Sequence, residues 1–177
     1  MINKTRYTEK LKPYITDKCE ENKISVTMEM DIPAKNYLVI KVDNFYNELG
    51  LKNTPPSVDC LILLKCADNS FFICLIELKD IKSPGGFSVD NIYIKFKTTI
   101  ENFMGSRFKN IFQNKRFIVK KLQIFFVTDP YGDKNSKRSR KREGTKLDTL
   151  LSRTPFQFRG KRYLVKHKLP NPIIQKC

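Results

Sequence analysis

Two different spacings of apolar residues organise the first third of the chain. Apolar and polar residues alternate strictly from Ile24 to Met30, which predicts a half-buried strand. From Ala34 to Leu49 apolar residues recur at the spacing of a helix, and Gly50 follows as a stop signal. This apolar stripe consists of Leu38, Val42, Phe45 and Leu49. The sequence therefore predicts a strand followed by an amphipathic helix.

Residues 58–66 and 71–78 are apolar at nearly every position. Such runs are typical of strands that are covered on both faces. The four residues between them, 67–70, are turn formers. We therefore expect a hairpin of two central strands.

A second helix is predicted after this hairpin, with Ser88 as its N-cap and Gly105 as its stop. Its apolar stripe is Ile92, Phe96, Ile100 and Phe103. Residues 122–128 predict another buried strand, and residues 162–165 a last one. The order indicates an α/β fold with a central mixed sheet flanked by helices.

The length of 177 residues suits one domain, residues 1–177. We expect a core over about residues 24–128, a basic loop over 133–146 and a basic C-terminal extension over 147–177. No apolar run is long enough to span a bilayer and no signal-peptide core precedes residue 13, so we expect a soluble protein without a membrane partner.

Five cysteines and a single histidine, His167, make a zinc site a poor match. An odd number of cysteines without a secretion signal predicts reduced thiols that behave as small buried apolar groups. The expected location is the cytoplasm, or the nucleus in a eukaryotic host. His167 lies among lysines and is interpreted as a surface residue.

The charge is distributed unevenly along the chain. Residues 1–79 hold 11 Lys/Arg and 11 Asp/Glu, whereas residues 80–177 hold 23 Lys/Arg and 7 Asp/Glu and therefore the whole net charge of +16. A positive face of this kind attracts a polyanion, and nucleic acid is the commonest such partner. A basic surface that only aids solubility is the alternative.

Asp59 and Glu77 are carboxylates within strands that are otherwise apolar, and Lys79 follows Glu77 at the spacing that places both on one side of a strand. Buried charges are costly unless they are paired or bind a metal. If all three lie at one end of the sheet, two carboxylates can hold Mg²⁺ and the lysine can position a water molecule. The alternative is that Glu77 and Lys79 lie at the exposed end of the strand and form a salt bridge with each other.

Register decides between these interpretations. Asp59 and Glu77 share one face only if the hairpin has an odd-length loop or a bulge near Asp59. An even, regular turn would point Asp59 to the other face.

The segment Ser57-Val58-Asp59, followed by Cys74-Leu75-Ile76-Glu77-Leu78-Lys79, resembles the signature of the PD-(D/E)XK nucleases. This superfamily includes most type II restriction endonucleases, Holliday-junction resolvases and several repair nucleases. The resemblance covers roughly Ala34 to Thr128, where the family's order of helix, strands, helix and strand also fits. Val58 stands where the family has proline, and the spacing from Asp59 to Glu77 is longer than in its tightest members.

The resemblance implies a restriction-endonuclease-like core in which Asp59 and Glu77 bind Mg²⁺, which Mn²⁺ can replace, and Lys79 orients the attacking water. It also implies an acidic residue on the first core helix that faces the metal, for which Glu48 is our candidate, with Glu29 as a weaker rival. On the following helix, Lys95 and Lys97 are candidates for contact with the DNA backbone.

Residues 134–146 hold seven basic residues and one acidic residue, a composition that cannot pack. We expect this arm to bind phosphates through Lys137, Arg138, Arg140, Lys141 and Arg142. The same cluster also resembles a nuclear import signal.

The expected function is Mg²⁺-dependent hydrolysis of DNA phosphodiester bonds, with double-stranded DNA as substrate and a type II restriction-type role. A homodimer is compatible with the size of the chain. A structure-selective resolvase or repair nuclease fits the same residues. A non-catalytic nucleic-acid-binding protein and an RNA nuclease remain alternatives.

Overall fold

A computed structural model describes residues 1–81, 86–129 and 145–177. Its centre is a six-stranded mixed sheet with the strand order β1-β4-β5-β6-β7-β10. The strands are β1 (Ile15–Thr16), β4 (Tyr37–Lys41), β5 (Cys60–Ala67), β6 (Ser70–Lys79), β7 (Ile118–Thr128) and β10 (Val165–Lys168). The expected α/β fold with a central mixed sheet flanked by helices is confirmed.

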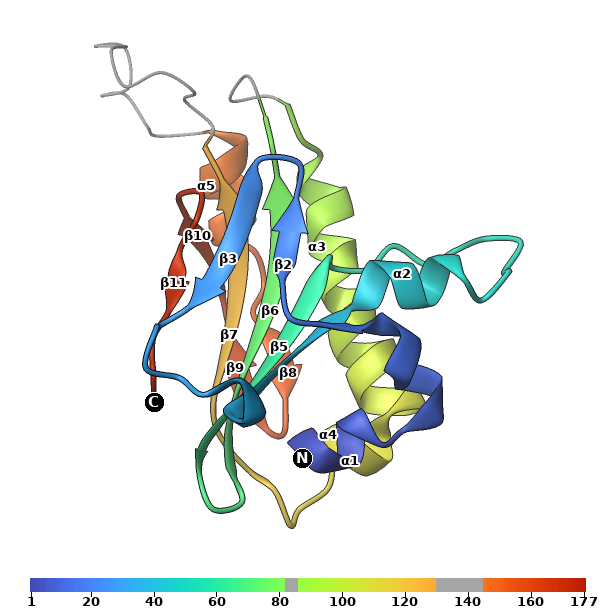
Figure 1. Cartoon of the computed structure of the whole chain (residues 1–177). Helices are drawn as coiled ribbons and strands as arrows, with labels where there is room; N and C mark the ends of the chain where they lie inside the picture. The colour runs from blue at the N-terminus through green and yellow to red at the C-terminus, as the bar shows by residue number, and fades with distance from the viewer. Residues whose placement is uncertain (82–85, 130–144) are drawn as a thin grey trace.

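Helices cover one face of this sheet (Figure 1). They are α1 (Ile2–Arg6), η1 (Glu9–Tyr14), α2 (Val42–Asn47), α3 (Val89–Thr98), the π-helix η3 (Thr99–Arg107), α4 (Lys109–Phe112) and α5 (Lys146–Leu151). The short 3-10 turn η2 (Ala34–Asn36) precedes β4 and buries no residue. The core on this side includes rings from α2 and η3, and Phe45 packs edge-on against Phe103 with 5.3 Å between the ring centres.

A small three-stranded sheet covers the other face (Figure 1). Its strands are β2 (Cys19–Glu21), β3 (Ile24–Met28) and β11 (Ile173–Ile174), in the order β11-β3-β2. The remaining strands, β8 (Phe156–Phe158) and β9 (Lys161–Tyr163), form a hairpin. Because both faces are covered, β6 is buried almost throughout and β5 is buried over its first five residues, Cys60–Leu64, as their apolar runs predicted.

The central sheet combines two kinds of connection. β4, β5 and β6 form an antiparallel meander, whereas β7 returns through α3, η3 and α4 to lie parallel to β6. β10 then adds parallel to β7. The carboxyl ends of β6, β7 and β10 therefore meet at one end of the sheet.

The predicted helix over residues 34–49 is wrong in its first half. Tyr37–Lys41 forms β4 and only Val42–Asn47 is α-helical. Leu38 and Phe45 are both buried, but one reaches the core from a strand and the other from a helix. The β-branched residues Val39 and Ile40 favour the extended form, and pairing with β5 decides the outcome.

The second predicted helix begins as expected. The Ser88 hydroxyl accepts a hydrogen bond from the amide of Asn91, and the predicted apolar stripe is buried. Gly105 does not stop the helix, which continues as a π-helix to Arg107. A Cβ at Gly105 would lie 3.1 Å from the carbonyl oxygen of Ile100, so this position favours glycine for close backbone approach.

The expectation of reduced cysteines is also corrected. Cys19 is joined to Cys60 and Cys66 to Cys177, while Cys74 is free and buried. The two pairs are 41 and 111 residues apart in sequence. Each pair therefore depends on the tertiary fold, which the cysteine spacing does not reveal.

Candidate active site

A β-bulge brings Asp59 opposite Glu77. The hairpin turns at Asp68 and Asn69, because Ala67 pairs with Ser70. A two-residue turn without a bulge would place Asp59 opposite Leu78. Cys66, however, is left unpaired, and this bulge shifts the pairing of the two strands by one residue. Cys60 consequently pairs with Ile76, and Asp59 and Glu77 occupy the next position on one face. The sequence predicted an odd-length loop or a bulge near Asp59. The turn has an even number of residues and the bulge lies at Cys66, beside the turn and not near Asp59.

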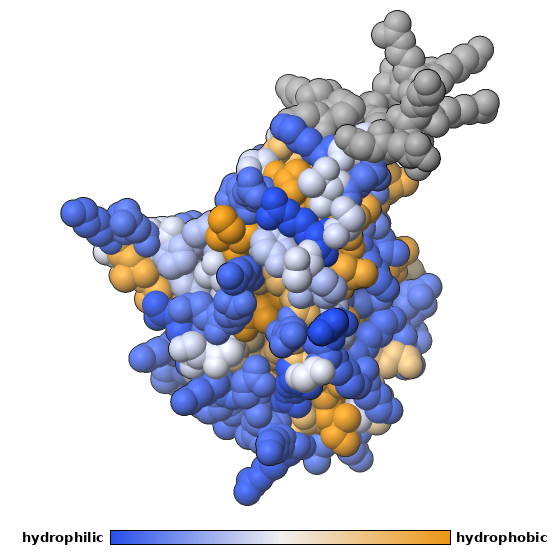
Figure 2. All heavy atoms as spheres, turned by 180° about the vertical axis from the view of Figure 1, so that it is seen from behind, coloured by the Kyte–Doolittle hydropathy of each residue, from blue (hydrophilic) through white to orange (hydrophobic). Residues whose placement is uncertain are grey.

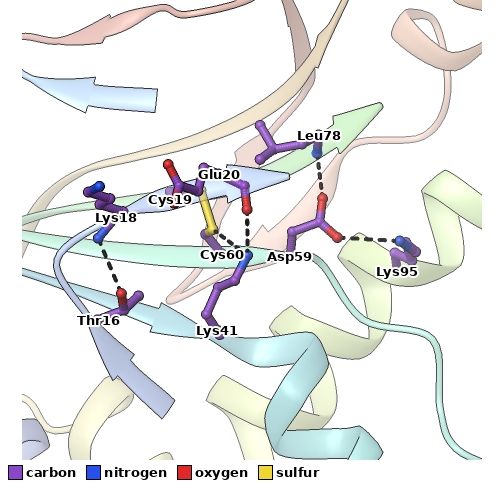
Figure 3. Close-up of a disulfide and its surroundings, with 9 residues drawn as sticks. All are labelled: Thr16, Lys18, Cys19, Glu20, Lys41, Asp59, Cys60, Leu78 and Lys95. Atoms are coloured by element: carbon purple, nitrogen blue, oxygen red, sulfur yellow. Dashed lines mark hydrogen bonds and ion pairs between the residues drawn. A yellow bond between two sulfur atoms is a disulfide. The ribbon is translucent and has the colours of Figure 1, made fainter. Parts of the chain in front are cut away.

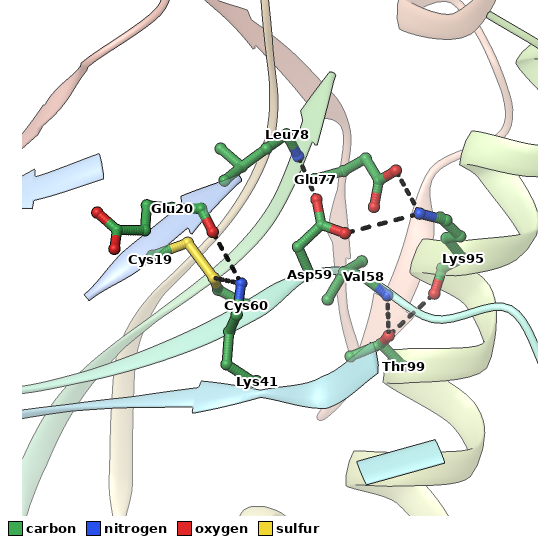
Figure 4. A network of polar contacts seen from close by, with 10 residues as sticks. All are labelled: Cys19, Glu20, Lys41, Val58, Asp59, Cys60, Glu77, Leu78, Lys95 and Thr99. Carbon is green, nitrogen blue, oxygen red and sulfur yellow. Dashed lines mark hydrogen bonds and ion pairs between the residues drawn. A yellow bond between two sulfur atoms is a disulfide. The ribbon is translucent and has the colours of Figure 1, made fainter. Parts of the chain in front are cut away.

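The two carboxylates are buried together, with Asp59 4% and Glu77 1% exposed. Oδ2 of Asp59 accepts a hydrogen bond of 2.6 Å from the amide of Leu78, as Figure 4 shows. Oε1 of Glu77 accepts one of 2.6 Å from Nζ of Lys95. The second carboxylate oxygen of Glu77, Oε2, is buried without a hydrogen-bond partner among the described residues. Such an oxygen is costly unless a cation or a donor approaches it.

Lys95 provides the positive charge at this site. Its Nζ lies 2.6 Å from Oε1 of Glu77 and 3.7 Å from Oδ1 of Asp59. The helix that carries it is fixed locally: the Thr99 hydroxyl donates to the carbonyl of Lys95 and accepts from the amide of Val58. This bond links the Lys95 turn to the residue before Asp59 (Figure 4).

Burial is the largest influence on the proton affinity of both carboxylates. It raises the pKa of Asp59 to about 6, against the opposing effects of Lys95 and of the Leu78 amide. It raises the pKa of Glu77 to about 8, where the neighbouring Asp59 adds to the increase and Lys95 opposes it. Burial by itself would lower the pKa of Lys95, but the two carboxylates outweigh it and raise that pKa. The pair is thus short of compensating positive charge.

Two further acidic residues lie near the pair, and sequence reasoning missed both. Glu21, on β2, raises the pKa of Asp59 and of Glu77. Asp43, in the first turn of α2, raises the pKa of Asp59, and its Oδ1 is buried without a partner among the described residues. Their sequence distances from Asp59 do not match the periodicity of a helix or a strand, because Glu21 and Asp43 belong to other elements of the fold.

A disulfide holds β2 beside the candidate site. Cys19 precedes Glu20 and Glu21, and its partner Cys60 directly follows Asp59 (Figure 3). Nζ of Lys41 donates to the carbonyl of Glu20 over 3.0 Å and so adds a second link between β2 and the sheet. The disulfide to Cys60, the residue after Asp59, therefore helps to hold the acidic strand β2 beside the two carboxylates.

Lys79 ends β6 two residues after Glu77 and is half-buried. It pairs with Thr128, whose hydroxyl donates to the Lys79 carbonyl over 2.7 Å. Its ammonium group forms no hydrogen bond or ion pair with the residues that the structure describes. The predicted alternative of a Glu77–Lys79 salt bridge does not occur, since Glu77 pairs with Lys95.

The other predicted residues have different surroundings. Glu48 accepts a hydrogen bond of 2.9 Å from the Tyr14 hydroxyl and makes no contact with Asp59 or Glu77 in the described part of the chain. Lys97 is exposed on α3. The five basic residues predicted to bind phosphates lie outside the described residues. They are Lys137, Arg138, Arg140, Lys141 and Arg142.

The interpretation of His167 as a surface residue is corrected. His167 is half-buried, and its Nε2 lies 2.9 Å from the carbonyl oxygen of Thr128. It sits on β10 beside Phe126, which itself lies beside Glu77. The side chain therefore contributes to the junction between β7 and β10.

The donor set fits a hard divalent cation. Mg²⁺ is commonly bound by one or two carboxylates, with substrate phosphates and water as its other ligands. Asp59 and Glu77 supply two carboxylates, and Oε2 of Glu77 accepts no hydrogen bond from the residues that the structure describes. Over residues 1–81, 86–129 and 145–177 no cluster of three Asp, Glu, His or Cys side chains forms a complete protein cage.

Comparisons with protein-family models, with curated proteins and with solved structures gave no match. The described part of the chain contains no helix that is long and apolar enough to cross a membrane.

Proposed function

We propose that this chain is a Mg²⁺-dependent endonuclease with a restriction-endonuclease-like core, which hydrolyses phosphodiester bonds in double-stranded DNA. The observation that carries the proposal is the buried Asp59–Glu77 pair, with Lys95 between the two carboxylates and one Glu77 oxygen unpartnered. Purely structural ion pairs satisfy their oxygens, whereas this pair keeps an acceptor open for a cation.

The surrounding fold supports the same function. Helix α2, the β5–β6 hairpin, the helical crossover and the parallel strand β7 follow the order of helix, strands, helix and strand that the signature implies. Asp59 and Glu77 lie next to each other at the carboxyl end of β6, where β7 and β10 also end. Ligands of sheets with parallel strands commonly bind at this end.

A divalent ion held by Asp59 and Glu77 would polarise a phosphoryl oxygen and supply a nucleophile at neutral pH. The chain itself contributes two ammonium groups. Lys79 follows Glu77 on the same side of β6, where an uncommitted ammonium can orient water and offset negative charge in the transition state. Lys95 can neutralise the carboxylates before substrate arrives.

The charge distribution supports a nucleic-acid substrate. Residues 80–177 carry 23 basic and 7 acidic residues, and this part of the chain includes α3 and the strands that follow β6. Figure 2 shows a largely hydrophilic surface on the helix-covered face, with only separate hydrophobic patches. Neutralised phosphates release counterions, so this surface supplies affinity without sequence specificity.

Cleavage assays with and without Mg²⁺ or Mn²⁺ test the proposal. The substrates are linear duplex, branched DNA, single-stranded DNA and RNA, and Glu77→Gln is the inactive control. Cleavage of duplex DNA at fixed sequences, found by sequencing the product ends, supports a restriction-type enzyme. Cleavage of branched DNA alone assigns a resolvase or repair role. Metal-dependent cleavage of RNA alone, or binding without cleavage, would overturn the DNA endonuclease.

A further inference from the structure

The last residues of the described chain form one wall of a hollow on the face of the sheet away from Asp59 and Glu77. β11 pairs in parallel with β3, and Cys177 is joined to Cys66 at the hairpin bulge. The Lys176 amide also donates to Oε2 of Glu29 over 2.8 Å. Held at both ends, this segment leaves a cavity of about 420 Å³ against β6 and β7.

The opposite wall combines aromatic rings with ammonium groups. Nζ of Lys121 lies 5.4 Å from the ring centre of Phe72, and Nζ of Lys168 lies 5.4 Å from that of Phe125. Lys120 also lines the hollow. The ring faces hold these ammonium groups over the cavity through cation–π attraction.

Positive charge in this hollow is not compensated by any acidic side chain of its described lining. No Asp or Glu side chain is among the described residues that line it. Lys120, Lys121 and Lys168 form no ion pair within the described ranges, whereas Lys176 is paired with Asp31 over 3.2 Å. Three uncompensated ammonium groups around one cavity favour an anion, and lysine is a common ligand of phosphate.

The hollow is separate from the carboxylate pair. Phe72 and Phe125 belong to the core beneath the small sheet, whereas Glu77 points to the helix-covered face. Successive residues of β6 alternate between these faces. A ligand in the hollow and a cation at Asp59 and Glu77 therefore occupy opposite sides of the sheet.

We propose that this hollow binds a small phosphorylated molecule of nucleotide size, with its phosphates on Lys120, Lys121 and Lys168 and its apolar part against Ile173 and Ile174 of the C-terminal segment. The volume falls within the range of about 300–1,000 Å³ that is usual for small-molecule sites. The proposal goes beyond the nuclease function and does not depend on it.

Calorimetric titration of the full chain in EDTA tests the site with ATP, tripolyphosphate and adenosine as probes. ATP and tripolyphosphate should bind and adenosine should not. The Lys121→Gln, Lys168→Gln double variant should bind ATP at least about tenfold more weakly, since it removes two charged contacts to the phosphates. The matched control is Lys52→Gln, Lys109→Gln, which removes the same charge from exposed positions outside the hollow.

Equal weakening in both double variants would show diffuse attraction to a basic protein and overturn the proposal, as would unchanged ATP affinity in the first variant. Amide NMR shifts provide a second measurement that needs no variant to fold. ATP should shift the amides of Gln123, Ile174 and Gln175. Shifts confined to the surroundings of Glu77 and Lys95 would place the nucleotide at the carboxylates and overturn the site. Because EDTA removes the metal, none of these outcomes depends on cleavage.

Discussion

Nζ of Lys95 lies 2.6 Å from Oε1 of Glu77, and this contact places a cation of the protein where the proposed function requires a metal. The same Nζ is 3.7 Å from Oδ1 of Asp59. Lys95 therefore stabilises the metal-free fold, since two buried carboxylates would otherwise face each other. It also competes with a divalent ion for the same oxygens.

Replacement of Lys95 by methionine should have opposite effects on folding and on metal binding. Loss of the ammonium leaves buried acceptors unsatisfied, so the free energy of unfolding in EDTA should fall by about 1–3 kcal/mol. Affinity for Mg²⁺, measured by calorimetry, should rise because the competing cation is absent. Lys97→Met, an exposed change on the same helix, should alter neither. Unchanged stability in Lys95→Met would contradict the pairing.

Changes at the carboxylates should remove cleavage but not binding. Asp59→Asn and Glu77→Gln are each expected to lower the cleavage rate at least about 10²-fold, because the interactions that they remove act mainly in the transition state. Lys79→Ala should do the same if its ammonium orients the water. The dissociation constant for duplex DNA, measured in Ca²⁺, should change little. Normal turnover by Glu77→Gln would exclude Glu77 as a metal ligand.

The stability of the metal-free protein should fall as pH rises from acid to mildly basic values. Glu77 has a pKa of about 8 in the folded state, above its ordinary value of 4.5. A carboxyl whose pKa is raised by folding contributes stability below the unfolded-state pKa and loses it as pH rises through the folded-state pKa. Asp59, with a pKa of about 6, acts in the same direction.

Urea unfolding in EDTA between about pH 4.5 and 8 measures this decrease in stability. Glu77→Gln, which cannot ionise, should flatten the dependence, and Mg²⁺ should restore stability at the upper end for the natural sequence. A stability curve that is equally steep in the Glu77→Gln variant would assign the dependence to other groups.

The Cys19–Cys60 disulfide should support both the fold and the site. It closes a loop of 41 residues in sequence separation, so its removal should lower the free energy of unfolding by about 2–4 kcal/mol. Cys19→Ser should therefore destabilise the chain and, because β2 lies beside Asp59, weaken metal binding. Cys177→Ser breaks the distant disulfide and is the control that should leave metal binding intact. If metal affinity falls equally in the Cys19→Ser and Cys177→Ser variants, the position of β2 beside Asp59 has no specific effect on metal binding.

The basic segment beyond β7 should govern the salt dependence of DNA binding. Its five basic residues lie outside the described residues, and β7, which precedes the segment in the chain, ends at Thr128. Alanine at Lys137, Arg138, Arg140, Lys141 and Arg142 should reduce the log–log salt slope by about 0.9 for each DNA phosphate that the variant no longer neutralises. Cleavage at saturating DNA should continue. A slope equal to that of the natural sequence would leave α3 and residues 153–168 as the binding surface.

The sequence predicted the central hairpin and the candidates Asp59 and Glu77 from local patterns, but the bulge at Cys66 that brings them opposite each other has no such pattern. Burial on two faces is visible as apolar runs, and alternation restricts which residues share a face. Lys95 was placed on the correct helix, but its contact with the carboxylates depends on how α3 rotates against the sheet. Asp43 and Glu21 approach from other elements, so no spacing along the chain indicates them.

The errors in the prediction have equally specific causes. A helical spacing from Leu38 to Leu49 arose from a strand that runs directly into a short helix, and single-sequence periodicity does not separate the two. Cysteine pairs that are 41 and 111 residues apart are joined only by the completed fold. Gly105 was interpreted as a helix stop, but it lies within the π-helix, where a Cβ would come within 3.1 Å of the Ile100 carbonyl oxygen.

The unpaired residue Cys66 restricts how this hairpin can change in length during evolution. Deletion of Cys66 alone would leave Lys65 opposite Phe71 and Ala67 opposite Ser70, so that Asp59 would still oppose Glu77 across a regular two-residue turn. Deletion of one residue between Asp59 and Cys66 would instead place Asp59 opposite Ile76, on the other face of the sheet. Single-residue deletions in descendants that retain the Asp59–Glu77 pair should therefore fall at position 66 or in the adjoining turn, and one within residues 60–65 should mark a lineage that has abandoned the site.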